Sequence, residues 1–254
     1  MKLDRRNQII DMINRQRTVK NSELMERFGI SIETVRRDLE YLENQGYLRR
    51  VYGGAVVNLS LSSEPEYASR SQARSEEKLA IAAEAARLVQ DHDSIYMGVG
   101  TTVQAMARFL RNVQELTVFT NALRTAVELS ELPGCAVILS GGRVRPKELA
   151  VSGFPAEENL SRFNVDKAFI GIGGITEAGV TDFHMDEASI HRQLIANARQ
   201  AIVLADSEKL GTRAVVNVCA LEQVDMIITD SGAPKHLVKE LEQAGVRVVI
   251  AKPL

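Results

Sequence analysis

Residues 31–44 read SIETVRRDLEYLEN, and this stretch decides the fold of the N-terminal part of the chain. Its apolar residues recur at offsets of 0, 3, 7 and 10 and therefore share one face of a helix: Ile32, Val35, Leu39 and Leu42. Ser31 stands just before them, where its hydroxyl can accept a hydrogen bond from the free backbone N–H groups that begin a helix. The pattern predicts an amphipathic helix that begins after Ser31 and ends before Gly46.

Two further helices are predicted upstream. Residues 5–16 carry a helical pattern of apolar side chains, and so does SELMERF at 22–28, whose inward-facing residues are Leu24, Met25 and Phe28. Asn21 or Ser22 can cap the second helix, and Gly29 is typical of the position just after a helix end. This is the helix-turn-helix arrangement, in which the last helix enters the major groove of DNA with its N-terminal residues first.

The predicted groove helix and the segment after it supply the candidate DNA contacts. On the helix these are Ser31, Glu33, Thr34, Arg36 and Arg37. An arginine can read guanine through two hydrogen bonds or contact phosphate without reading sequence, and both roles remain open. The run YLRRVYGGAVV at 47–57 predicts a β-ribbon with a Gly53-Gly54 turn, on which Arg49 and Arg50 would lie beside the phosphate backbone. The alternative for both arginine pairs is the solvated surface of a small helical domain.

The formal charge of −2 is unevenly distributed along the chain. Residues 1–57 hold 11 basic and 8 acidic residues, a net +3, whereas residues 58–254 hold 20 and 25, a net −5. This asymmetry indicates that the N-terminal part meets a polyanion. Because a net +3 supports few phosphate contacts, one copy should bind weakly and salt-sensitively. We therefore expect a homo-oligomer, a dimer or a tetramer, that places two or more copies on repeated half-sites.

Beyond residue 57 the composition changes twice. Residues 58–75 are polar and predict a linker, and from Glu76 helical patterns alternate with short apolar runs. We expect a winged helix-turn-helix domain at 1–57, a linker at 58–75 and an open, mostly parallel, Rossmann-like α/β domain at 76–254. The predicted strands are 94–99, 116–120, 136–139, 167–172, 201–205, 225–229 and 246–250. The helices predicted between them are 102–110, 123–132, 156–163, 187–198 and 234–244.

The carboxyl ends of these predicted strands carry glycines, hydroxyls and charges, at the edge where open α/β sheets bind ligands. A glycine turn that opens a helix favours an anion, and the cations, amides and carboxylates nearby suit the phosphate and hydroxyls of a phosphorylated sugar. The candidate effector-binding residues are Gly98, Gly100, Thr101, Thr102, Asn121, Gly141, Gly142, Arg143, Glu187, Asp206 and Lys209. For each of them an ordinary turn or surface loop is the alternative.

Other classes of protein and site are not favoured. Early charges argue against a signal peptide, and no uncharged run could span a membrane, so we expect a cytoplasmic protein without membrane contact. Cys135 and Cys219 lie in apolar runs and are expected to be buried, inert thiols. Glu187 and His191 share a helix face, but no third ligand supports a metal site, which leaves a polar lid over the effector or a solvated helix start. We expect no metal and no cofactor.

The N-terminal residues resemble the DNA-binding domain of DeoR-family bacterial transcriptional regulators. The resemblance rests on the run from Ser31 to Leu39 and on Tyr52-Gly53-Gly54-Ala55. The α/β part resembles the sensor domain of the same family, which is similar in turn to ribose-5-phosphate isomerase. Its matching stretches include Gly100-Thr101-Thr102, Thr120-Asn121, Gly141-Gly142, Glu187-Ala188 and Asp206-Ser207 with Lys209. The resemblance implies a repressor of a carbohydrate operon, with double-stranded operator DNA and a small intracellular sugar phosphate as its partners.

Two positions depart from the family pattern, and two other functions stay open. Gly98 stands where the family usually has Asp, and His191 stands where it often has Lys. The loss of a carboxylate at the ligand turn should alter the recognition of hydroxyls. One alternative function is a sugar-phosphate isomerase that uses Asp206 and Lys209 as an acid and base. The other is a cytosolic ligand-binding protein that does not contact DNA.

Overall fold

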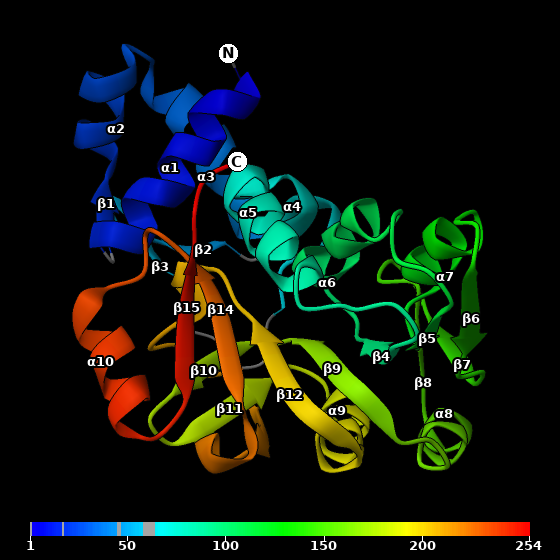
Figure 1. The fold of residues 1–254 in the computed structure, drawn as a ribbon. Coiled ribbons are helices and arrows are strands. Elements are labelled where there is room, and N and C mark those ends of the chain that lie inside the picture. The colour runs from blue at the N-terminus through cyan, green and yellow to red at the C-terminus, as the bar shows by residue number, and fades with distance from the viewer. Residues whose placement is uncertain (1, 17, 45–46, 58–63) are drawn as a thin grey trace. The chain divides into compact units, whose positions relative to one another are not determined.

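The computed structural model describes residues 2–16, 18–44, 47–57 and 64–254 (Figure 1). The chain divides into two units, Met1–Ala73 and Arg74–Leu254, and each is described by itself. The predicted end of the groove helix, at 45–46, and the first part of the predicted linker, at 58–63, lie outside the described residues. Within the described ranges no helix combines the length and apolarity needed to cross a membrane.

The first unit contains the three predicted helices and a three-stranded antiparallel sheet of order β1-β3-β2. The helices are α1 (Lys2–Gln16), α2 (Asn21–Phe28) and α3 (Ile32–Asn44), and α4 (Tyr67–Gln72) follows within the predicted linker. The strands are β1 (Thr18–Lys20), β2 (Leu48–Val51) and β3 (Gly54–Val57). The predicted apolar stripes meet in one buried cluster that includes Ile9, Ile13, Leu24, Val35, Leu39 and Leu42. The winged helix-turn-helix prediction is therefore confirmed.

The start of α2 differs from the prediction. Lys20 occupies the N-cap position and its side chain makes no capping hydrogen bond, so neither Asn21 nor Ser22 caps this helix. The end of α2 is as predicted, because Gly29 adopts the left-handed conformation with φ +60°.

The wing turn also differs from the prediction. Tyr52 and Gly53 form the turn, and Gly54 is already the first residue of β3. Gly54 lies opposite Lys20 in β1, a strand too short to be predicted from its pattern. A Cβ on Gly54 would lie 2.0 Å from the backbone oxygen of Val19, so the added strand leaves room only for glycine.

The second unit is built on a seven-stranded sheet of order β15-β14-β12-β9-β4-β5-β6, in which every pairing is parallel. Its strands are β4 (Ser94–Met97), β5 (Leu116–Thr120), β6 (Cys135–Leu139), β9 (Val165–Gly171), β12 (Ala198–Leu204), β14 (Met226–Asp230) and β15 (Arg247–Ala251). All seven predicted strands are present, and their ends shift by a few residues. The prediction of a mostly parallel α/β domain is confirmed.

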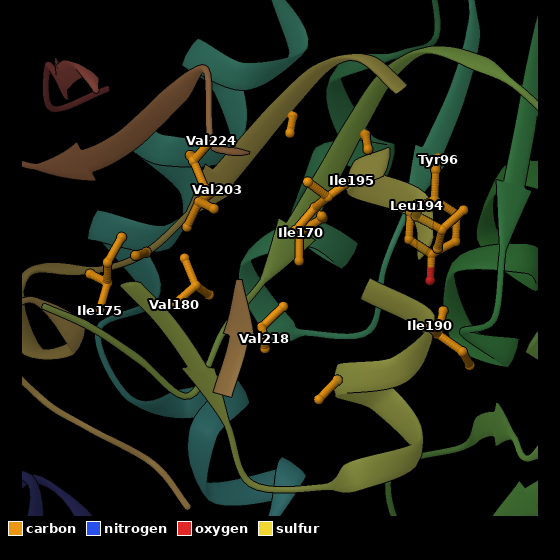
Figure 2. Close-up of a cluster of buried hydrophobic side chains, with 14 of the residues drawn as sticks. Tyr96, Ile170, Ile175, Val180, Ile190, Leu194, Ile195, Val203, Val218 and Val224 are labelled. Carbon is orange, nitrogen blue, oxygen red and sulfur yellow. The ribbon is translucent and has the colours of Figure 1, made fainter. Parts of the chain in front are cut away.

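Helices cover both faces of this sheet. They are α5 (Ser75–Ala86), α6 (Thr101–Ala105) with a 3-10 turn at Met106–Phe109, α7 (Leu123–Ser130), α8 (Phe154–Leu160), α9 (Met185–Asn197) and α10 (Lys235–Gln243). Alternate residues of β9 point to opposite faces, since Ile170 packs in the cluster of Figure 2 with Leu194 of α9, whereas Phe169 packs with Ile81 of α5. The central strands of the sheet are buried on both faces, as in parallel sheets generally, whereas Ile138 and Leu139 of the edge strand β6 are exposed.

Two small β structures were not predicted. One is an antiparallel sheet of order β10-β11-β13, formed by Gly174–Thr176, Gly179–Asp182 and Val216–Cys219. The other is the hairpin of β7 (Arg143–Arg145) and β8 (Ala150–Ser152), which follows the carboxyl end of β6. Cys135 and Cys219 are free and half-buried, not fully buried as expected.

Candidate functional site

Helix α3 is built to expose its first turns. Ser31 caps it, with its Oγ 3.4 Å from the backbone N of Thr34 and 3.2 Å from the Thr34 hydroxyl. Val35 and Leu39 are 0 and 1% exposed and fix the opposite face in the core. Arg36 and Arg37 are exposed and form no hydrogen bond or ion pair with any described residue. Both guanidinium groups are therefore free to contact a ligand outside the unit.

An ion-pair cluster behind α3 was not predicted. Asp38 is 1% exposed and accepts hydrogen bonds from Arg5 Nε at 2.7 Å and from Arg6 Nε at 2.8 Å. The guanidinium of Arg6 also lies 3.7 Å from the ring centroid of Tyr41. This Asp38 clamp braces α1 against α3 and uses two of the basic charges internally. An acidic residue next to the apolar stripe was the available signal, but its partners lie more than thirty positions away.

The wing arginines differ in how free they are. Arg50 forms an ion pair with Glu43 of α3 at 2.6 Å, and its backbone N–H donates to the same carboxylate at 2.7 Å. Hydrogen bonds from the backbone and then the side chain of Arg50 lower the pKa of Glu43. Arg49 is exposed and has no ion-pair partner among the described residues. Of the two arginines, Arg49 is therefore the one whose charge no described acidic residue neutralises, and it can contact a polyanion.

The sheet order decides which predicted effector residues can come together. Strands β4, β5 and β6 are neighbours, so the residues after them share one stretch of the carboxyl edge: Gly98, Gly100, Thr101, Thr102, Asn121, Gly141, Gly142 and Arg143. Gly100, at φ +146°, precedes α6, and the two threonines open that helix. Asp206 and Lys209 follow β12, which is separated from β4 by β9.

Asn121 is an interior residue. It is fully buried, accepts a 2.5 Å hydrogen bond from the Tyr96 hydroxyl at Oδ1, and donates to the backbone oxygen of Val151 at 3.2 Å. Burial, and then the charge of Glu187, raise the pKa of Tyr96, so its hydroxyl stays protonated and keeps donating. The side-chain amide of Asn121 is therefore held in place in the protein interior, directly after β5.

A pocket of about 400 Å³, lined by both charged and apolar residues, lies between the β7–β8 hairpin and the start of α9. Its lining is Arg143, Val144, Arg145, Pro146, Ser152, His184, Met185, Asp186 and Glu187. Arg145 pairs with the buried Glu187, and Arg143 lies 3.3 Å from Asp186. Since the side chain of Arg143 is 81% exposed, its loose pair can be exchanged for an anionic ligand. Arg145 lines this pocket but is absent from the predicted set, because the hairpin that carries it is not predicted.

The two departures from the family pattern lie against each other. A Cβ on Gly98 would lie 3.3 Å from His191 Nε2 and 3.4 Å from the backbone oxygen of Phe169. His191 is 1% exposed, and neither ring nitrogen has a hydrogen-bond partner among the described residues, although Nδ1 lies 3.3 Å from Asp182 Oδ2. The absence of a side chain at position 98 therefore makes room for this imidazole. No cluster of three or more metal-ligating side chains occurs in the described part of the chain.

Asp206 and Lys209 enclose a short 3-10 turn (Ser207–Lys209) at the end of β12. Asp206 is 6% exposed and its Oδ1 accepts from the backbone N of Glu208 at 3.2 Å. Lys209 is half-buried, with Nζ 5.6 Å from the ring centroid of Phe183. The turn presents a carboxylate and an ammonium at the carboxyl edge of the sheet.

Each of the two units matches a known domain family. Residues 5–60 match the DeoR-like helix-turn-helix domain, and residues 73–231 match the DeoR C terminal sensor domain. The chain is 37% identical over 252 residues to the HTH-type transcriptional regulator YulB of Bacillus subtilis (strain 168), covering 99% of this chain and 97% of that protein. It is 32% identical over 238 residues to the glycerol-3-phosphate regulon repressor of Escherichia coli (strain K12), covering 93% and 94%.

A solved structure also shows similarity. Ribose 5-phosphate isomerase from Plasmodium falciparum matches with 16% identity and a TM-score of 0.40, over 53% of this chain and 52% of that chain. The family rests on the sequence matches to both units, which together cover nearly the whole chain. The chain belongs to the DeoR family of helix-turn-helix transcriptional regulators.

Proposed function

We propose that the protein represses a carbohydrate operon by binding operator DNA through its first unit, and that a small phosphorylated sugar-like effector bound by the second unit releases it. One observation carries the proposal: α3 is anchored by a buried stripe while Arg36 and Arg37 at its start are exposed and unpaired among the described residues. Relatives named as repressors, among them an HTH-type repressor of Bacillus subtilis and the glycerol-3-phosphate regulon repressor, support the same role.

In this proposal α3 enters the major groove and the wing follows the backbone. Ser31, Glu33, Thr34, Arg36 and Arg37 face the base edges or the flanking phosphates, and Arg49 with Arg50 contacts phosphate. Arg5 and Arg6 are paired with Asp38 inside the unit, so these two cations are not free to contact phosphate. A homo-oligomer, a dimer or a tetramer, therefore supplies the affinity by placing several such helices on repeated half-sites. The working form acts in the cytoplasm as domains 1–57 and 76–254 joined by residues 58–75.

The effector proposal rests on the charges at the strand ends. Arg143, after β6, and Lys209, after β12, are the two candidate cations for a phosphate, and Thr101, Thr102 and Asp206 are candidate partners for hydroxyls. Glu187 and the pocket beside Arg143 add further polar groups. Gly98 contributes only backbone, so hydroxyl recognition falls to the other side chains.

We further infer that the second unit binds its effector without converting it. Asp206 is the carboxylate that an isomerase reaction would use as base, and here its Oδ1 already caps the 3-10 turn. Incubation with pentose and hexose phosphates, followed by chromatographic analysis, tests this inference. Turnover that disappears in Asp206→Asn would contradict it.

The DNA-binding half is tested by selecting duplexes from a random pool and measuring affinities by fluorescence anisotropy. If Arg36 or Arg37 reads a base, its substitution by Ala should reduce the free energy of operator binding by about 1–3 kcal/mol and relax sequence specificity. If the residue contacts phosphate, the substitution should weaken binding to all sequences alike and lower the slope of the salt dependence by about 1. Arg87→Ala is the matched control, because among the described residues this exposed arginine of the second unit pairs only with Glu84, three residues away. A protein that prefers no sequence would contradict the proposal.

The effector half is tested by thermal shift with phosphorylated sugars and glycerol 3-phosphate, each beside its unphosphorylated counterpart. A compound present at a hundredfold excess over its Kd should raise the apparent stability by about 2.7 kcal/mol. Lys209→Ala and Arg143→Ala should weaken this response, whereas Arg162→Ala, which removes an exposed helix-surface pair with Glu158, should not. Equal responses to phosphorylated and unphosphorylated compounds would exclude the phosphate as a recognised group.

A further inference from the structure

Arg74 is the first residue of the second unit and stands directly before α5. Its backbone is left-handed, with φ 51° and ψ 44°, a conformation that side-chain-bearing residues adopt only when their surroundings hold them there. The segment 64–73, the last part of the first unit, ends directly before this residue. The way in which Arg74 is held therefore decides how that segment enters the second unit.

The guanidinium of Arg74 reaches the carboxyl ends of two neighbouring strands. Nη2 donates to Ser207 Oγ at 2.9 Å, after β12, and to Asp230 Oδ2 at 3.0 Å, at the end of β14. Nη1 lies 3.5 Å from Glu208 Oε1. The side chain is only 20% exposed, so these contacts form in a partly desolvated setting.

Asp230 joins these groups into one network. Its Oδ1 accepts the backbone N–H of Ser207 at 2.7 Å, and its Oδ2 accepts the backbone N–H of Gly232 at 2.8 Å in addition to Arg74. The residue is 2% exposed, so the guanidinium supplies its countercharge. Burial lowers the pKa of Arg74, but the carboxylates of Asp230, Glu208, Asp206 and Glu77 outweigh burial and raise it, so the charge of Arg74 is fixed.

The turn that Arg74 holds is the turn that carries two predicted effector residues. Ser207 and Glu208 lie between Asp206 and Lys209, and Asp206 accepts the backbone N–H groups of Glu208 at its side chain and of Lys209 at its carbonyl. An effector that draws on Asp206 or Lys209 must therefore act on a turn whose other two residues contact Arg74.

We propose that Arg74 is the positioning residue that transmits effector occupancy at the 206–209 turn to the segment leading to the DNA-binding unit. The proposal rests on the proposed function, because it takes Asp206 and Lys209 as effector contacts. When the 206–209 turn shifts, the acceptors around the Arg74 guanidinium change. The left-handed backbone of Arg74, directly before α5, is then held more or less firmly. Arg74 touches neither DNA nor effector in this scheme.

One test needs no effector. Asp206→Asn weakens the cap of the turn, and hydrogen exchange is followed at the start of α5, where the backbone N of Lys78 donates to the carbonyl of Arg74 at 3.0 Å. We expect Asp206→Asn to reduce protection there in the parent protein and to cause no further loss in the Arg74→Lys background. Lysine keeps the charge but lacks the planar fork with which Arg74 reaches Ser207, Asp230 and Glu208 together. The same loss in both backgrounds, or none in the parent, would overturn the proposal.

A second test measures operator affinity with glucose 6-phosphate, glycerol 3-phosphate or inorganic phosphate as the probe. Arg74→Lys should bind an active probe as the parent does, yet lose most of a coupling that typically amounts to about 5- to 150-fold in affinity. Arg199→Ala, which removes an 84% exposed arginine paired with Asp166, is the matched control and should release normally. Normal release by both Arg74→Lys and Arg74→Ala would overturn the proposal. If the parent itself responds to none of the probes, the proposed function is in question and the exchange experiment alone decides on Arg74.

Discussion

The Asp38 clamp provides a prediction with a magnitude that follows from the structure. Asp38→Asn removes the charge that two arginines share, and breaking a buried ion pair from one side costs about 3–5 kcal/mol. The side chains of Arg5 and Arg6 remain 18 and 12% exposed, which favours the lower end, about 3 kcal/mol. A unit of 73 residues has a stability of about 4–11 kcal/mol at the usual value per residue, so this loss leaves a folded but weakened unit.

Hydrogen exchange of the full-length protein measures this loss directly. At about 1.4 kcal/mol per tenfold, amides of α3 should lose protection by roughly a hundredfold, while those of β9 in the second unit keep theirs. Glu43→Gln is the matched control on the same helix, because its ion pair with Arg50 is solvent-exposed and should matter far less. Equal protection in Asp38→Asn and Glu43→Gln would refute the assignment of Asp38 as the brace between α1 and α3.

Three further outcomes are expected. Gly54→Ala should disorder the wing and abolish DNA binding, because its Cβ would lie 2.0 Å from the Val19 oxygen, and unchanged anisotropy titrations would contradict this. Tyr96→Phe leaves Asn121 Oδ1 buried without its donor and should cost about 1–3 kcal/mol in urea unfolding; a loss below the error of the midpoint would show that the bond contributes little. Cys219, whose pKa burial raises to about 11, should react with a thiol-specific reagent far more slowly at pH 8 than in the urea-unfolded chain, and equal rates would contradict the burial.

Most of the second unit was predictable, because buried parallel strands read as short continuous apolar runs between helical patterns. The strands β10, β11 and β13 have only three or four residues each, too few to establish an alternating pattern. The β7–β8 hairpin was missed for the same reason, and with it the place of Arg145 in the pocket.

The candidate DNA-contact residues of the first unit, and the residues that support them, are only partly predictable from the sequence. The exposed positions Arg36 and Arg37 follow from helical periodicity, because the buried stripe defines the opposite face. The role of Asp38 depends on α1 folding back to α3, which no local pattern reports. The sequence predicts Gly54 as a turn residue, whereas in the structure a glycine is required there because strand β1 approaches its Cα. Sequence patterns therefore predict positions that depend on local periodicity, but not roles that depend on long-range contacts.

The two departures from the family pattern illustrate the same point. Gly98 and His191 are separated by more than ninety positions, and the sequence alone offers no reason to consider them together. In the structure the imidazole of His191 lies beside the backbone of Gly98, so the two residues that depart from the family pattern are neighbours. We expect a side chain added at position 98 to crowd the His191 imidazole.

The central claim is that a phosphorylated sugar controls a sequence-specific DNA-binding protein. The most direct measurement is the affinity of the full-length protein for its selected operator, titrated with each phosphorylated sugar and with its unphosphorylated counterpart at constant salt. We expect at least one phosphorylated compound to lower operator affinity by about 5- to 150-fold, while its unphosphorylated counterpart leaves it unchanged and binding to a shuffled duplex stays weak throughout. If no phosphorylated sugar changes operator affinity, or if operator and shuffled DNA bind equally, the protein is not a sequence-specific repressor controlled by a phosphorylated sugar.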